Sequence, residues 1–118
     1  MNEAKAKWGR WIAGRQHTGY FKMLLAQSQL WKFDVHLLKF EKGAFIPFHT
    51  DPVDNFRHFR LNVVLKKSSG GGLFLCDRPL WSIKNRVYLF RSDLSPHAVS
   101  KVQGGTRYVL SIGWLRSM

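Results

Sequence analysis

The sequence holds a single cysteine, Cys76, among 118 residues. One thiol cannot form an intramolecular disulfide, and it cannot supply a cysteine-based zinc or iron–sulfur site. So few thiols are typical of a reducing compartment, and we therefore expect a cytoplasmic location. No apolar run reaches the length of a membrane span, and residues 1–7 are polar and basic without the apolar core of a signal peptide. We expect no membrane association.

Acidic residues are also scarce, with seven Asp and Glu against 19 Lys and Arg, which gives a formal charge of +12. Such a field attracts polyanions, so an acidic protein segment or a nucleic acid is a candidate partner. The cations are scattered along the chain without a dense basic run, and a solvated basic surface explains them equally well. The hydrophobic fraction of 45% and the 14% of aromatic residues exclude a disordered chain.

Helical periodicity is nearly absent. The length predicts one domain, residues 1–118, in which residues 1–18 form an N-terminal extension. Trp8, Trp11 and Ile12 stand at i, i+3 and i+4, which favours a short helix there. Beyond it, eight to nine short strands alternate with turn signals about every ten residues. This pattern predicts an all-β sandwich or barrel, and a jelly-roll is the version that brings distant strands to one metal.

His49, Asp51 and His97 are the candidate metal ligands. Two imidazoles and one carboxylate can occupy one side of an iron(II) ion and leave its other positions open for substrate. On an extended segment the side chains at i and i+2 point to the same face, so His49 and Asp51 can reach one ion. His97 would come from a separate strand. Each residue also has an ordinary structural alternative. His49 and Asp51 could belong to a surface turn, and His97 could be a half-exposed histidine in a loop.

Arg107 opens an apolar strand ten residues after His97. A guanidinium at such a position loses hydration unless a carboxylate meets it, and the strand contains no acidic residue. If this strand pairs beside the one that carries His97, the guanidinium of Arg107 lies near the metal, where it could bind a carboxylate. An arginine with its charged end in water is the alternative. Phe74, Trp81 and Phe90 are candidate cavity walls, with ordinary core packing as the alternative.

Together these stretches resemble the iron(II)/2-oxoglutarate-dependent oxygenase superfamily, whose fold is the double-stranded β-helix, a cupin-like jelly-roll. The matching segments are residues 49–51, 60–65, 71–74, 89–93, 97–102 and 105–112. Within the superfamily the chain is most similar to the small microbial and phage relatives of aspartyl/asparaginyl β-hydroxylase. Mammalian members of that group carry a glycine at the position of Asp51 and a histidine at that of Asn62.

The resemblance implies that His49, Asp51 and His97 bind Fe(II), and that Arg107 binds the distal carboxylate of 2-oxoglutarate. It also implies cosubstrate contacts by three further residues, namely Arg60, Asn62 and Ser111. The expected function is a dioxygenase that uses O2 to hydroxylate a substrate, for example a protein Asp or Asn side chain, while 2-oxoglutarate is decarboxylated to succinate. Two alternatives stay open, a non-redox cupin-like metal- or anion-binding module and a basic nucleic-acid-binding or demethylating protein. Substrate and oligomeric state are not predicted.

Overall fold

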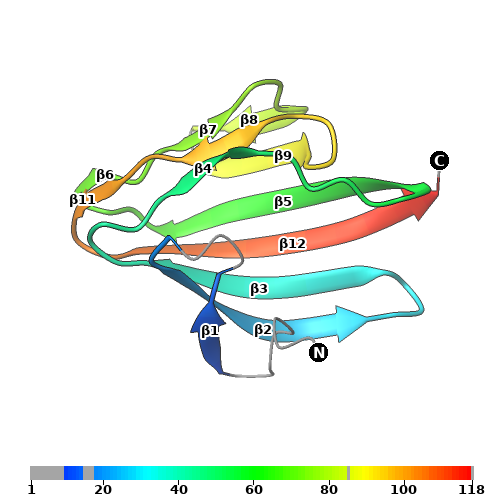
Figure 1. Ribbon diagram of the computed structural model, residues 1–118, viewed down its shortest axis with the longest axis horizontal. Coiled ribbons are helices and arrows are strands. Elements are labelled where there is room, and N and C mark those ends of the chain that lie inside the picture. Colours follow the sequence, from blue (N-terminus) through cyan, green and yellow to red (C-terminus); the bar gives the residue numbers. More distant parts are fainter. Residues whose placement is uncertain (1–9, 15–17, 85, 118) are drawn as a thin grey trace.

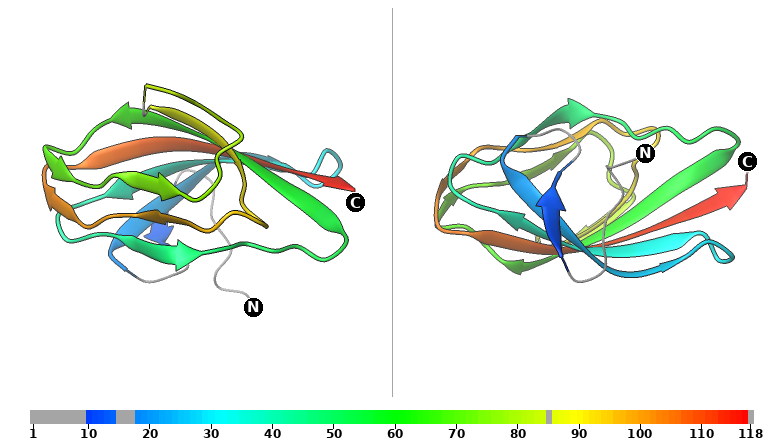
Figure 2. Two further views of the ribbon diagram at one scale, coloured as in Figure 1. Left: turned by 90° about the horizontal axis from the view of Figure 1, so that it is seen from above. Right: turned by 60° about the horizontal axis from the view of Figure 1, so that its bottom comes forward.

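The computed structural model describes residues 10–14, 18–84 and 86–117. In these ranges the chain forms twelve strands and no helix. The strands make two facing layers, which are seen edge-on in the left view of Figure 2. The predicted all-β jelly-roll is therefore confirmed.

The larger layer is a seven-stranded antiparallel sheet (Figure 1). Its order is β1 (Trp11–Ala13), β2 (Tyr20–Ser28), β3 (Phe33–Phe40), β12 (Arg107–Ser117), β5 (Phe56–Lys66), β9 (Val87–Arg91) and β8 (Trp81–Ile83). The two longest strands, β5 and β12, pair along almost their whole length at the centre of the sheet. Residues far apart in the sequence thereby share one face.

The smaller layer consists of β4 (Ile46–His49), β10 (His97–Val99) and β7 (Phe74–Cys76), with β10 in the middle. A third, two-stranded sheet pairs β6 (Gly70–Gly71) with β11 (Val102–Gly104). Gly71 and Gly72 both have positive φ, of 66° and 67°. A Cβ on Gly71 would lie 2.0 Å from the carbonyl oxygen of Lys101, so this close pairing requires glycine.

Alternation along β3 and β12 decides which side chains face the space between the layers. In β12, Arg107, Val109 and Ser111 are buried, whereas the residues between them are partly exposed. In β3, Phe40 is fully buried at the end of the same face. Because side chains alternate between the two faces of a strand, these residues share the inner face of the large sheet. That face therefore carries polar as well as apolar side chains.

An apolar core fills one end of the space between the layers. Tyr20 stacks on Phe40 with ring centroids 5.2 Å apart and an angle of 16° between the rings. Val64, Val99 and Val109 pack around this pair and are at most 6% exposed. The core holds the two layers together and leaves the remaining space for a cavity.

The structure departs from the sequence analysis in two places, the expected helix and the strand pairing considered for Arg107. Trp11 and Ile12 lie in β1, paired with β2, and not in a helix, while Trp8 lies outside the described residues. Tertiary pairing of this segment with the sheet edge outweighs its weak helical pattern. The strand that begins at Arg107 pairs with β3 and β5 in the large sheet, and not with β10, which carries His97. No helix among the described residues is long and apolar enough to cross a membrane.

The core predicts a contrast between two leucines. Leu24 is 2% exposed on β2, and Leu24→Ala should lower the free energy of unfolding by about 2 to 5 kcal/mol through lost burial and a residual cavity. Leu30, 80% exposed in the following turn, is the matched control, and Leu30→Ala should change it by less than about 0.5 kcal/mol. Urea unfolding followed by tryptophan fluorescence measures both, and equal effects would contradict the assigned core.

Candidate metal centre and anion pocket

His49 and His97 lie opposite each other on neighbouring strands of the small sheet. In the antiparallel pair β4–β10, His49 is the register partner of His97. Their ring centroids are 4.3 Å apart. The sequence separates these residues widely, so their approach is a product of the β4–β10 pairing alone.

Each histidine is oriented by a backbone carbonyl two residues earlier. Nδ1 of His49 lies 2.8 Å from the carbonyl oxygen of Pro47, and Nδ1 of His97 lies 2.9 Å from that of Ser95. A carbonyl only accepts hydrogen bonds, so Nδ1 carries the proton in both rings. In the neutral imidazole Nε2 is then an unprotonated lone pair, the form that binds a metal.

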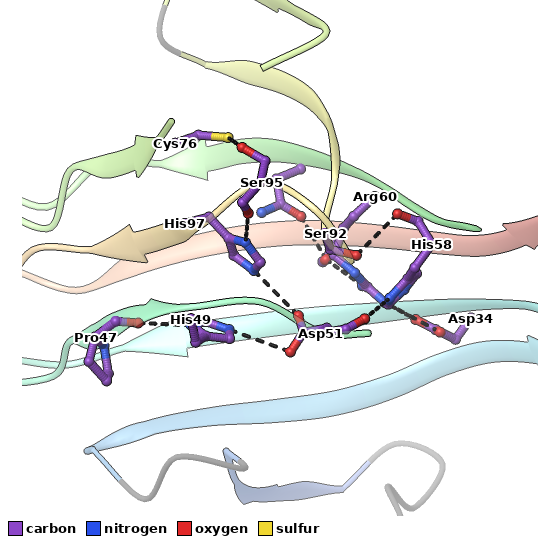
Figure 3. Close-up of polar contacts among 12 residues, drawn as sticks. Asp34, Pro47, His49, Asp51, His58, Arg60, Cys76, Ser92, Ser95 and His97 are labelled. Atoms are coloured by element: carbon purple, nitrogen blue, oxygen red, sulfur yellow. Dashed lines mark hydrogen bonds and ion pairs between the residues drawn. The ribbon is translucent and has the colours of Figure 1, made fainter. Parts of the chain in front are cut away.

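Both Nε2 atoms face the carboxylate of Asp51 (Figure 3). Oδ1 of Asp51 is 3.6 Å from Nε2 of His49, and Oδ2 is 3.3 Å from Nε2 of His97. The Asp51 amide donates to the carbonyl of Ser92 at 2.7 Å, which ties the loop after β4 to the end of β9. A divalent cation placed among these three atoms would be coordinated by two imidazole nitrogens and a carboxylate oxygen, so this donor set fits a metal.

The three candidate ligands offer donor atoms that all lie within 4.8 Å of one another. All three line a cavity of about 270 Å³ between the layers. Phe74 and Phe90 also line it, whereas Trp81, half-exposed on β8, does not. Polar side chains of the large sheet, among them Arg107, also line the cavity.

Arg107 enters this cavity from the large sheet at the first position of β12. It is 4% exposed, and its guanidinium lies 5.2 Å from the centre of the Phe40 ring. Burial lowers the pKa of Arg107 to about 10, which leaves the group charged at neutral pH. Within the described part of the chain no carboxylate forms an ion pair with it, so the cavity holds a buried cation suited to an external anion.

Arg60, Asn62 and Ser111 form a connected polar group on the inner face of the large sheet. Nη1 of Arg60 donates to Oγ of Ser111 at 2.7 Å, and that hydroxyl donates to Oδ1 of Asn62 at 2.7 Å. Nη2 of Arg60 donates to Asp34 at 3.1 Å. The structure therefore brings the three predicted cosubstrate residues together, and it neutralises Arg60 with a partner that the sequence reasoning missed.

Asp34 is that missed partner. Burial opposes its ionisation, but the hydrogen bond from His36 and the charge of Arg60 outweigh it and lower the pKa of Asp34 to about 2. Its position on the same strand face as His36, Leu38 and Phe40 was the available signal. An acid on a cavity-facing strand face needs a cation from a neighbouring strand.

His58 lies between the metal loop and this polar group. Nδ1 approaches the carbonyl oxygen of Asp51 at 3.4 Å, and Nε2 lies 3.3 Å from Nη2 of Arg60. Burial, and next the charge of Arg60, lower the pKa of His58. The ring is therefore neutral at pH 7, with Nε2 as an acceptor for Arg60.

The family model described as the 2OG-Fe(II) oxygenase superfamily matches residues 35–116, which include all seven predicted site residues. The chain belongs to this superfamily. Membership implies Fe(II) as the metal and 2-oxoglutarate as the cosubstrate. No curated protein sequence matches the chain at a significant level.

Solved structures with the same fold include a prolyl-4-hydroxylase from Pseudomonas putida, with a TM-score of 0.68 and 18% identity over 93% of this chain and 78% of that one. KdgF from Halomonas sp. has a TM-score of 0.60 and 14% identity, covering 91% and 87% of the two chains. The Cnp3 cupin domain from Schizosaccharomyces pombe has a TM-score of 0.61 and 9% identity over 82% of this chain. The match spans 65% of the Cnp3 chain, less than two thirds of its length. At these identities the similarities establish the jelly-roll fold.

The Asp34–Arg60 pair predicts a pH-dependent loss of stability in Asp34→Asn. Because the folded pKa of about 2 lies below the ordinary aspartate pKa of 3.8, the carboxylate stabilises the fold above about pH 4, and this contribution is lost as the pH falls toward 2. At pH 7 the variant should lose about 1 to 2 kcal/mol, a figure reduced for the partial exposure of Asp34.

The difference between the Asp34→Asn variant and the wild type should vanish near pH 2, as measured by urea unfolding across this range. Asp77, exposed and 3.6 Å from Arg78, is the matched control, and Asp77→Asn should leave stability unchanged. A deficit in Asp34→Asn that does not depend on pH would contradict the pair.

Proposed function

We propose that this protein is an Fe(II)/2-oxoglutarate-dependent dioxygenase that hydroxylates its substrate while 2-oxoglutarate is decarboxylated to succinate. One observation carries the proposal. Two imidazole Nε2 atoms and a carboxylate converge on one side of a cavity, and the other side holds a buried arginine without an acidic partner in the described chain. A divalent cation would bind to the three donor atoms on the first side, and a dianionic acid would bind between this cation and the arginine.

In this proposal His49, Asp51 and His97 hold the iron. The Pro47 and Ser95 carbonyls keep the protons on Nδ1, so both Nε2 lone pairs are available without rearrangement. Bound Fe(II), together with O2 and 2-oxoglutarate, supplies the oxidising chemistry of the superfamily. The chain itself orients the ligands and leaves the other metal positions to the cosubstrate and O2.

Arg107 binds the distal carboxylate of 2-oxoglutarate. Its planar group can donate two parallel hydrogen bonds to a carboxylate, which a lysine cannot match. The formal charges then cancel: +2 on iron and +1 on Arg107 against −1 on Asp51 and −2 on 2-oxoglutarate. Since burying an unpaired charge is costly, this neutrality favours binding of the metal and the dianion together. The aromatic rings of Phe74 and Phe90 keep water from the reacting side.

We also propose that residues 1–118 form one oxygenase domain in the cytoplasm, and that its nearest relatives in the superfamily are those of the aspartyl/asparaginyl β-hydroxylase group. The Arg60–Asn62 stretch supports that relation. A protein Asp or Asn side chain is then a candidate substrate, and the charge of +12 favours an acidic segment around it.

A first experiment tests the metal and cosubstrate site. Titrating the anaerobic Fe(II) protein with 2-oxoglutarate should produce a weak visible charge-transfer band. His49→Ala, Asp51→Ala and His97→Ala should abolish both the band and succinate formation. Asp54 is exposed in the same loop as Asp51, and Asp54→Ala is the matched control that should keep both. Turnover that survives a strong chelator would refute the proposal.

The same titration separates the alternatives. Metal binding without the band and without succinate would favour a cupin-like binding module, which the fold similarities also fit. Tight, steeply salt-dependent binding of DNA or RNA would favour a nucleic-acid-binding or demethylating role.

A second experiment tests Arg107. Arg107→Met keeps the length of the side chain and removes its charge, and it should weaken 2-oxoglutarate binding about 100-fold through loss of a buried charged contact. Metal affinity should stay unchanged. Arg116→Met, exposed near the end of the same strand, is the control and should bind like the wild type. Calorimetry on the anaerobic metal-loaded protein measures both, and equal affinities would remove Arg107 from the site.

A further inference from the structure

Two rows of polar residues cross the inner face of the large sheet. The register aligns Arg60 with Gly113 and Gly113 with Asp34, across β5, β12 and β3. Two residues along, it aligns Asn62 with Ser111 and Ser111 with His36. Both rows belong to the same three strands, and the hydrogen bonds of Arg60 connect them.

Gly113 makes the first row possible. A Cβ at this position would lie 2.1 Å from Nη2 of Arg60 and 2.6 Å from its Cζ. The guanidinium of Arg60 therefore lies directly over the backbone of β12 and reaches Asp34 on the far side, with oxygen distances of 3.1 and 3.4 Å. This places both the charge and the donor direction of Arg60 under the control of Asp34.

The direction of the next hydrogen bonds follows from chemistry. An arginine has donors only, so the hydroxyl of Ser111 accepts from Nη1 of Arg60. Its own proton then goes to Oδ1 of Asn62. If the amide of Asn62 were reversed, the hydroxyl of Ser111, 2% exposed, would have no acceptor for its proton in the described chain. The row thus allows one orientation of the amide.

That orientation leaves the NH2 group of Asn62 for the cavity. Within the described residues Nδ2 forms no hydrogen bond, yet no buried side-chain nitrogen is without a partner, so Nδ2 is accessible. Asn62 lines the same cavity as the metal residues and Arg107. Two fixed N–H donors therefore face the space where an anion is expected.

We propose that Asp34, Arg60 and Ser111 form a positioning relay that fixes the Asn62 amide with its two donors toward the cavity, where Asn62 binds a carboxylate oxygen of 2-oxoglutarate. The ligand assignment rests on the proposed function above. Of these four residues only Asn62 touches the ligand, whose distal carboxylate is bound by Arg107 in the proposed function. Arg60 and Ser111, which the sequence suggested as direct contacts, act through it.

Calorimetry with 2-oxoglutarate and anaerobic metal-loaded protein tests the ligand contact. Asn62→Ala should weaken binding about tenfold, the loss of one hydrogen bond to a charged group. Asn62→Asp, of the same shape but without donors, should weaken it further. Metal affinity should not change in either variant. Wild-type affinity in Asn62→Ala would overturn the contact.

A double-mutant cycle tests whether Ser111 acts through Asn62. Ser111→Ala should weaken binding several-fold in the wild type and have no effect in the Asn62→Ala background, and Ser111→Thr, which keeps the hydroxyl, should restore it. Asp34→Asn should behave like Ser111→Ala in both backgrounds. Additive effects would mean that these residues contact the ligand or the fold independently, and would overturn the relay.

A ligand-free measurement separates this inference from the proposed function. In 1H–15N spectra, Ser111→Ala and Asp34→Asn should both shift the side-chain NH2 signals of Asn62, while the exposed-residue control Asp77→Asn should leave them in place. Unmoved signals would overturn the relay even if 2-oxoglutarate binds. Moved signals without any binding of 2-oxoglutarate to the wild type would support the relay, and would overturn both the ligand assignment and the proposed function.

Discussion

The hydrogen bonds from Nδ1 of His49 and His97 to backbone carbonyls are the constraint on which the site depends. Each bond fixes the proton on the nitrogen farther from Asp51. Without them either ring could turn its other nitrogen toward the carboxylate. With them, three electron-rich atoms are held together. The fold thus holds together three atoms that could bind a single cation.

The two layers contribute different chemistry. The small sheet and the loop after β4 supply the candidate metal ligands, whereas the large sheet supplies Arg107 and the polar row that ends at Asn62. The two arginines of the large sheet that line the cavity, Arg60 and Arg107, differ in their partners. Arg60 is matched by Asp34 on a neighbouring strand, while Arg107 has no such acid in the described chain. The buried charge of Arg107, which has no acidic partner among the described residues, favours an anion in the cavity.

Much of the site was predictable because its residues carry local signals. Short spacing placed Asp51 beside His49, and a position at the start of an apolar strand marked Arg107. The all-β fold followed from alternation and turn residues. What could not be predicted depends on register between distant strands. Arg60 crosses over Gly113 to reach Asp34 only because three strands are aligned in register. Nothing in the sequence around the arginine or the glycine indicates this alignment. For the same reason the sequence could not exclude pairing of the Arg107 strand with β10, which belongs to the opposite layer. The helix expected at Trp11 failed because pairing with β2 decided the segment.

Since the metal residues and Arg107 belong to opposite layers, the span between them is set by how thickly the core is packed. Tyr20, Phe40 and the surrounding valines pack between the two sheets and so set the distance between them. An acid bound between the sheets would have to fit this distance. If the cavity binds a dicarboxylate as proposed, the size of these apolar residues would limit the length of the acid that fits. Replacing one of these core residues by a larger or smaller one would then change the distance between the two sheets.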